Sequence, residues 1–174
     1  MSSSSIPIID IKDIQSAKGL EEIGLQLKEV YSDIGFGTLI NHGVDQKLID
    51  QVFELSQMFH AKPMAEKMTL KRKGHYFRGY TPPEDYVMRQ SAILDTTSVA
   101  NLNASLNIMP DLGESLFASL ANTPYGGVNQ WLESMPSMQG VIAEFRDQMT
   151  DLSRRLMNAF ELGLKIPKDS LNEL

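Results

Sequence analysis

The sequence predicts a mixed α/β or α+β fold with a few short strands, several amphipathic helices and one long helix near the C-terminus. Three observations support this class. A β-branched run at 6–11 and a mostly apolar run at 35–40 are separated by a helical pattern, and a longer helical pattern begins at Pro136. The order strand, helix, strand and further helices is typical of α/β and α+β arrangements.

The first strand is expected at Ile6–Ile11, where β-branched residues are followed by polar ones. Pro7 favours an edge position, because proline cannot donate a hydrogen bond to a neighbouring strand. The next segment repeats apolar residues at the helical spacing. These are Leu20, Ile23, Leu27, Val30, Tyr31 and Ile34. Gly35 is expected to end this helix in the left-handed conformation.

The second strand is expected at Gly35–Ile40, after which Asn41–Gly43 turns the chain. Asp45 is suited to cap a second helix, because its short carboxylate can accept from the first backbone N–H groups. The apolar residues of this helix are Leu48, Ile49, Val52, Phe53, Leu55 and Phe59. Pro63 should end it and open a short third helix that runs to about Arg72.

The segment Gly74–Gly127 is predicted to be loop-rich with weak helical patches. A long helix then follows over Pro136–Leu164, which would span about 43 Å at 1.5 Å per residue. Its apolar residues include Met138, Val141, Ile142, Phe145, Met149, Leu152, Leu156, Ala159, Phe160 and Gly163. The apolar side of such a helix needs a large partner surface, and the two expected strands are too few to cover it.

Composition excludes several classes of protein. A chain of 174 residues with 42% hydrophobic residues suits one globular domain, or a domain and a piece of another, and excludes global disorder. The absence of cysteine removes disulfides and cysteine-ligated metals. A net charge of −6 argues against nucleic acid as a partner. Because no apolar run suggests a membrane span, the expected location is the cytoplasm.

The sequence contains no recognisable motif for metal binding or catalysis. The three histidines, His42, His60 and His75, do not lie at metal-binding spacing. A His-x-Asp pair is also absent, because the residues two positions after them are Val44, Lys62 and Phe77. We therefore assign no metal ligand and no catalytic residue, and expect His42 to hydrogen-bond the backbone of its own turn.

Several short motifs nevertheless follow one another in an ordered series along the chain. They are Ile6–Asp10, Ile34–Val44 with its Gly-Phe-Gly and Asn-His-Gly-Val parts, Phe59 and Pro63 ahead of Glu66-Lys67, Arg78-Gly79-Tyr80, Ser105–Ile108, Asn129-Gln130-Trp131 and Phe145-Arg146. In this order they resemble the N-terminal region of isopenicillin-N-synthase-like non-haem Fe(II), 2-oxoglutarate-dependent dioxygenases. The resemblance covers nearly the whole chain.

The resemblance implies a two-part enzyme in which this region packs against a catalytic jelly roll. In that family the jelly roll holds Fe(II) with two His and one Asp and binds 2-oxoglutarate through an Arg-x-Ser motif, all downstream of the long helix. Only ten residues follow Leu164 here, and Arg89–Ser91 precedes that helix, so we interpret it as a coincidence. The resemblance therefore implies an N-terminal portion, with residues 1–5 flexible, 6–127 the N-terminal domain and 128–174 leading into an absent jelly roll.

By position, the resemblance also implies four residues at the border of the substrate pocket: Arg78, Tyr80, Ser105 and Asn107. The first two would bind a carboxylate or stack on a ring, and the other two would offer hydrogen bonds. Asn103-Ala104 and Leu132 depart from the family pattern, which has charged residues and proline there. Fe(II), 2-oxoglutarate and a small-molecule substrate are implied for the intact enzyme, whereas this chain is expected to be inactive alone.

Two alternatives remain open at this point. One is a stand-alone, non-catalytic protein-interaction module that binds a partner or a second copy through the long amphipathic helix. The other is a small helical scaffold unrelated to oxygenases, which would lack a strand pair formed by 6–11 and 36–40. The sequence leaves open the substrate, the oligomeric state and the choice among hydroxylation, desaturation and ring closure.

Overall fold

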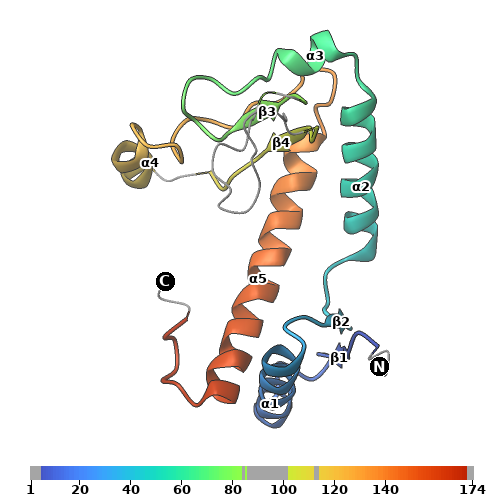
Figure 1. The fold of residues 1–174 in the computed structure, drawn as a ribbon, viewed down its shortest axis with the longest axis vertical. Helices are drawn as coiled ribbons and strands as arrows, with labels where there is room; N and C mark the ends of the chain where they lie inside the picture. The colour runs from blue at the N-terminus through green and yellow to red at the C-terminus, as the bar shows by residue number, and fades with distance from the viewer. Residues whose placement is uncertain (1–4, 84, 86–101, 112–113, 172–174) are drawn as a thin grey trace, which may run out of the picture. The chain divides into compact units, whose positions relative to one another are not determined.

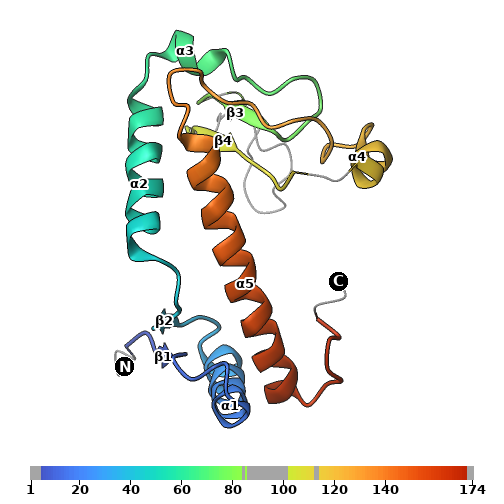
Figure 2. The ribbon, with the colours of Figure 1, turned by 180° about the vertical axis from the view of Figure 1, so that it is seen from behind.

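The computed structural model describes residues 5–83, 85, 102–111 and 114–171, so the Arg89–Ser91 motif lies outside the described residues. The helices and strands appear in Figures 1 and 2. In chain order they are β1 (Ile8–Asp10), α1 (Ala17–Asp33), β2 (Thr38–Ile40), α2 (Gln46–Ala61), α3 (Met64–Met68), β3 (Gly79–Thr81), β4 (Ser105–Asn107), α4 (Glu114–Leu120) and α5 (Met138–Leu164). The chain divides into two compact units, Met1–Gln51 with Ile142–Leu174, and Val52–Val141.

The first unit contains the predicted strand–helix–strand arrangement. Strand β1 pairs with β2 in parallel, with Ile8 opposite Thr38 and Asp10 opposite Ile40. Because parallel neighbours need a crossover connection, α1 has to lie between them in the sequence. The expected strand pair is thus confirmed, although each strand is shorter than the apolar run that predicted it. The alternative of a small helical scaffold unrelated to oxygenases, which would lack this pair, loses its support.

Both ends of α1 are explained by local sequence. Ser16 caps the N-terminus, where its hydroxyl accepts a hydrogen bond from the Gly19 N–H at 3.0 Å. At the other end Gly35 has a φ of 89°, and its N–H donates to the Val30 carbonyl at 3.2 Å. The left-handed glycine end predicted for this helix is therefore confirmed.

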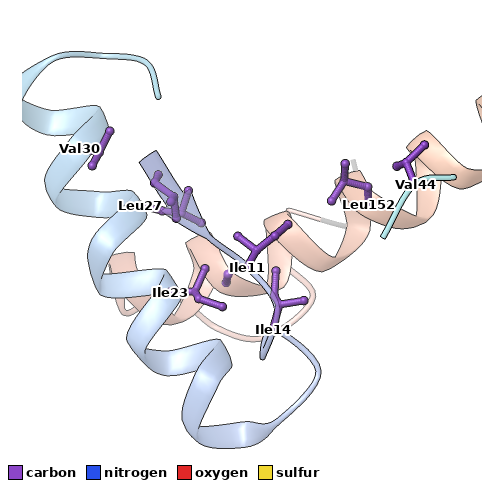
Figure 3. Packing of buried hydrophobic residues seen from close by; sticks show 9 residues of the cluster. Ile11, Ile14, Ile23, Leu27, Val30, Val44 and Leu152 are labelled. Atoms are coloured by element: carbon purple, nitrogen blue, oxygen red, sulfur yellow. The ribbon is translucent and has the colours of Figure 1, made fainter. Parts of the chain in front are cut away.

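The core of this unit lies between α1, the strand pair and α5. Figure 3 shows Ile23, Leu27 and Val30 on one face of α1, turned toward Ile11 and Ile14. The buried cluster is completed by Ile9, Val44, Leu152 and Ala159. Because burying one aliphatic side chain contributes about 1.5–3 kcal/mol, this cluster is the main source of the unit's stability.

Helices α1 and α5 approach each other closely at two glycines. A Cβ atom added to Gly163 would lie 2.1 Å from the Gly24 carbonyl oxygen, and one added to Gly24 would lie 2.3 Å from the Ala159 carbonyl oxygen. Real Cβ atoms do not approach backbone atoms this closely, so only glycine fits at either position. The helical pattern included Gly163 on the apolar side without indicating this contact.

A buried acid organises the chain after α5. Glu161 is 2% exposed, and its two carboxylate oxygens accept from the backbone N–H groups of Asp169 at 2.8 Å and Leu171 at 2.7 Å. A buried carboxylate needs such partners, because an unpaired buried charge is strongly unfavourable. Glu161 therefore holds the turn 165–171 against the end of α5, a role that the sequence pattern did not indicate.

The second unit departs from the sequence prediction in two places. Helix α3 ends at Met68 and not near Arg72, with Pro63 at its N-cap position. Strands β3 and β4 form an antiparallel pair inside the segment predicted to be loop, with Gly79 opposite Asn107 and Thr81 opposite Ser105. Three-residue strands are too short to show an alternating pattern, so their pairing depends on the tertiary structure.

Helix α2 largely matches its predicted stripe. Leu48, Leu55 and Phe59 are buried, whereas Phe53 is 66% exposed. Phe53 lies five positions after Leu48, which at 100° per residue places it off the buried side. Its expected role in the core is therefore wrong. The predicted N-cap is confirmed, because Asp45 Oδ1 accepts from the Lys47 N–H at 2.9 Å.

A carboxylate beside the strand pair makes stability depend on pH. The Asn41 amide and the Lys12 N–H both donate to Oδ1 of Asp10, at 2.9 Å and 3.0 Å. These hydrogen bonds favour the ionised form and hold the pKa of Asp10 below its ordinary value of 3.8. The bond from Asn41 has the larger effect. Their contribution to stability is fully present above pH 3.8 and is lost as the pH falls through the lowered pKa of the folded state.

Replacing Asn41 with glycine is expected to raise the pKa of Asp10 toward 3.8, because the stronger of the two bonds is removed. Glycine is the suitable replacement, since residue 41 has a φ of 56°. An NMR pH titration of the Asp10 side chain measures the change. A pKa that is the same in the parent chain and in Asn41→Gly would show that this bond does not govern the titration.

Candidate functional site

Arg78, a predicted substrate residue, lies buried just before β3. It is 3% exposed, and its guanidinium donates to four oxygen atoms. The acceptors are the Gly126 carbonyl at 3.2 Å, the Met109 carbonyl at 3.1 Å, Asn129 Oδ1 at 2.9 Å and the Pro110 carbonyl at 2.9 Å. Since arginine has five N–H donors, four of them serve the surrounding chain.

Tyr80, on β3, is fully buried. Its ring meets that of Phe59 edge-to-face at 5.7 Å, and the Lys67 ammonium lies 6.0 Å from the ring centroid. Its hydroxyl lies 3.9 Å from the Met64 sulfur, a weak contact. Lys67 in turn donates to the His60 carbonyl at 2.7 Å. The described contacts of Tyr80 are therefore those of a packing residue.

Ser105 and Asn107 lie on β4 and are half-buried. Asn107 contributes to an open groove of about 390 Å³, whose other walls come from Phe77, Leu106, Ile108 and Met109. Phe77 also contacts the ring of Tyr125 at 5.4 Å. Within the described residues, the Asn107 side chain has no hydrogen-bond partner. The groove thus combines four apolar lining residues with one asparagine, a composition typical of sites for small organic ligands.

A second, smaller hollow of about 130 Å³ lies in the same unit. It is lined by Lys73, Tyr76, Arg78, Gly127, Val128 and Gln130. The Tyr76 hydroxyl donates to the Ala121 carbonyl at 2.9 Å, so the tyrosine presents mainly its ring to the hollow. Gly127 has a φ of 78°, and an added Cβ there would lie 3.2 Å from that ring. The hollow is therefore confined by close packing of Gly127 against Tyr76.

Among the described residues of this unit, Glu66 carries a shifted pKa. Ser134 donates a short hydrogen bond to Glu66, and the Lys62 ammonium lies 3.4 Å from the same carboxylate. The serine bond, followed in importance by the lysine, lowers the pKa of Glu66 below its ordinary value. These residues join the end of α2 and α3 to the segment before α5. They lie outside the residues that line the groove, so we assign them a structural role.

The histidines do not form a site in the described residues. His42 Nδ1 accepts from the Val44 N–H at 3.1 Å, so its predicted role in the turn is confirmed. The His42 carbonyl accepts from Arg155 Nη2 at 3.0 Å, which ties the turn to α5. Among the described residues, no three His, Asp or Glu side chains gather to hold a metal ion. Over the same residues, no helix is long and apolar enough to span a membrane.

The structure brings the predicted site residues to one strand pair but gives them different environments. Arg78 and Tyr80 point into packed surroundings, whereas Ser105 and Asn107 lie on the partner strand. Sequence reasoning did not identify Phe77, Ile108 or Met109 as walls of a groove. The signal for them was that Ile108 belongs to the Ser105–Ile108 motif, and that Phe77 and Met109 each lie next to a recognised motif.

Comparisons with known proteins agree with this fold. Residues 6–134 match a family described as non-haem dioxygenase in morphine synthesis, N-terminal. Homoarginine-6-hydroxylase 2-ODD-C23.1 of Arabidopsis thaliana is 25% identical, over 92% of this chain and 48% of its own length. Jasmonate-induced oxygenase 2 of the same plant is 24% identical, over 98% of this chain and 42% of its own length.

A solved structure shows the same fold at low sequence identity. A Caulobacter crescentus protein assigned to the 2OG-Fe(II) oxygenase family has a TM-score of 0.76 and 20% identity, over 98% of this chain and 52% of its own. The chain thus spans about half the length of the relatives it matches. Since the family match covers most of the chain, this protein belongs to the non-haem dioxygenase N-terminal family and corresponds to the N-terminal region of 2-oxoglutarate/Fe(II)-dependent dioxygenases.

Proposed function

We propose that this chain forms the N-terminal part of a 2-oxoglutarate/Fe(II)-dependent oxygenase, supports its catalytic jelly roll and borders its substrate pocket. The relatives named as a hydroxylase and an oxygenase support the reaction class, and their length leaves room for a second half of similar size. In this proposal 6–127 is the N-terminal domain, and 128–174 leads through α5 toward the jelly roll.

The described residues do not fit the iron site of such an enzyme. A site of this class needs two histidines and one carboxylate around a single ion, with open positions for the other reactants. His42 Nδ1 already accepts a backbone hydrogen bond, and no suitable group gathers among the described residues. We therefore assign Fe(II) and 2-oxoglutarate to the other half and propose that this chain is inactive alone.

Exposed apolar side chains on β1 and β2 and in the residues just before each strand support the proposed contact with a jelly roll. Side chains alternate between the two faces of a strand, so the buried Ile9 leaves its neighbour Ile8 turned outward. The exposed fractions are 53% for Ile6, 61% for Ile8, 55% for Phe36 and 41% for Ile40. Several exposed large apolar side chains in one short region of the fold are typical of an interaction surface.

The observation that carries the pocket role is the groove beside β4. It is open, and its lining residues are apolar apart from Asn107. Such a surface suits a flat organic molecule with one hydrogen-bonding group. Ser105 lies on the same strand, and we propose that it borders the pocket with Asn107. Arg78 and Tyr80 are proposed to contribute through the strand that they anchor.

Replacing Asn107 with alanine is expected to weaken binding of flat aromatic probes to the groove by about fivefold, the effect of losing one ordinary hydrogen bond. The probes are phenol, indole and benzamide, titrated into the 174-residue protein and followed by amide NMR shifts of Leu106, Ile108 and Met109. Leu25→Ala is the matched control, because Leu25 is 50% exposed on α1 in the other unit. Shifts scattered over the surface, or equal affinity in Asn107→Ala, would contradict the pocket role.

The alternative of a protein-interaction module rests on α5. Met149, Leu162 and Leu164 are exposed on this helix at 38%, 46% and 49%. Leu152 and Ala159 of the same helix are buried in the first unit, so part of its apolar side is already covered. No observation favours this alternative over the oxygenase proposal, so the interaction module stays a prediction. The cytoplasmic location also stays a prediction.

A further inference from the structure

The wall of the groove continues into an irregular segment that needs backbone partners. Met109 and Pro110 lie just after β4, beyond Ile108 and outside regular secondary structure. Buried N–H and C=O groups in such segments have to be satisfied by other groups. The Met109 N–H donates to Asn129 Oδ1 at 3.1 Å, and the Met109 carbonyl accepts from Asn129 Nδ2 at 2.8 Å. One asparagine side chain thus satisfies both backbone groups of Met109.

Arg78 completes the same set of contacts. It donates to the Met109 and Pro110 carbonyls and also to Asn129 Oδ1, which lies 51 positions later in the sequence. Asn129 Nδ2 donates in addition to Asp111 Oδ1 at 2.9 Å. The two side chains therefore hold Met109–Asp111 from two separate parts of the chain, and each of them orients the other.

We propose that Arg78 and Asn129 form a positioning pair that fixes the Ile108–Met109 wall of the groove. Neither residue lines the groove itself, so the pair acts through the backbone that it holds. The importance of this wall for a substrate rests on the proposed function. The pair also explains why an Arg-Gly-Tyr motif and an Asn-x-Trp motif occur in one chain, because each motif contributes one of its two members.

The chemistry of both residues suits this task and limits substitution. The planar guanidinium presents several donors in fixed directions and can bridge separate carbonyls, whereas a lysine ammonium concentrates its donors on one atom. Asparagine offers both a donor and an acceptor, whereas an ionised aspartate only accepts and would lie beside Asp111. Gly79 adds to the fit, since a Cβ there would lie 2.8 Å from Gln130 Nε2.

Amide hydrogen exchange of the full 174-residue protein tests the pair directly. In Arg78→Lys and in Asn129→Leu, which removes the oxygen that accepts from the Met109 N–H, the exchange of the Met109 amide is expected to be faster by about tenfold or more. Exchange of core amides in the other unit, such as Leu27, should stay unchanged. Arg155→Lys is the matched control, because Arg155 also donates to a backbone carbonyl, that of His42, but in the first unit. It should leave Met109 exchange unchanged.

Chemical rescue of Arg78→Ala tests whether Arg78 acts through the hydrogen bonds of its guanidinium group or only by filling space. In Arg78→Ala, low millimolar guanidinium is expected to restore protection of the Met109 amide, whereas sodium chloride at equal ionic strength is not. If Arg78→Ala does not fold, Arg78→Lys and Asn129→Leu carry the test. Unchanged Met109 exchange in these variants would overturn the proposal. The exchange measurement needs no ligand and tests only the Arg78–Asn129 pair. The proposed substrate role of the groove is tested separately by the probe titration, so either proposal can fail without the other.

Discussion

Replacing Gly163 with alanine is expected to lower the free energy of unfolding of the unit that contains α1 and α5 by about 3 kcal/mol, at the upper end of overpacking effects. The added Cβ would lie 2.1 Å from the Gly24 carbonyl oxygen and 2.6 Å from its carbon. These are backbone atoms in the middle of a helix, so they cannot move aside as a flexible side chain would. The steric clash can be relieved only if the two helices move apart, which opens the core between them.

Gly140→Ala provides the control on the same helix. An added Cβ at Gly140 meets nothing within 4 Å, and alanine favours helix over glycine by up to about 1 kcal/mol. Urea unfolding of the parent chain and of both variants should therefore move the midpoint in opposite directions. Equal stability of Gly163→Ala and the parent chain would show that α1 and α5 do not approach at this position in solution.

Replacing Tyr80 with alanine is expected to cost about 3–5 kcal/mol of the stability of the second unit, as for other buried aromatic residues. The ring is fully buried against Phe59, with Lys67 nearby, so its removal leaves a cavity. Tyr80→Phe should be nearly neutral, because the hydroxyl has only its weak contact with Met64. Thermal unfolding followed by circular dichroism measures both changes.

Tyr125→Ala is the matched control for this prediction. Tyr125 lies in the same unit but is 54% exposed, so its loss should change stability by less than about 1 kcal/mol. A Tyr80→Phe variant as unstable as Tyr80→Ala would contradict the assignment of Tyr80 to packing. A large effect confined to the alanine variant would show that the ring stabilises β3 by filling space.

The sequence indicated that Arg78 and Asn129 belong to motifs, but it did not indicate what their side chains contact. The motif around Arg78 was visible, but a lone arginine in a sequence does not reveal whether it meets solvent, a ligand or carbonyl groups. Its acceptors belong to residues 31 to 51 positions away, and no local pattern brings them together. The same reason kept Asn129 from being paired with Arg78, although both lie in recognised motifs.

The sequence by itself determined the long helices, the two short strands of the first pair, the caps at Gly35 and Asp45 and the resemblance to the dioxygenase family. The helices, strands and caps depend on the spacing of apolar residues and on backbone preferences within a few positions, which are local properties, whereas the resemblance depends on the order of short motifs along the chain. Tertiary structure alone decided the β3–β4 pair, the approach of Gly24 to Gly163, the buried Glu161 and the groove walls. Each of these requires segments that are distant in the sequence to meet. A buried polar group, for example, is stabilised only by hydrogen-bond partners that the fold brings to it.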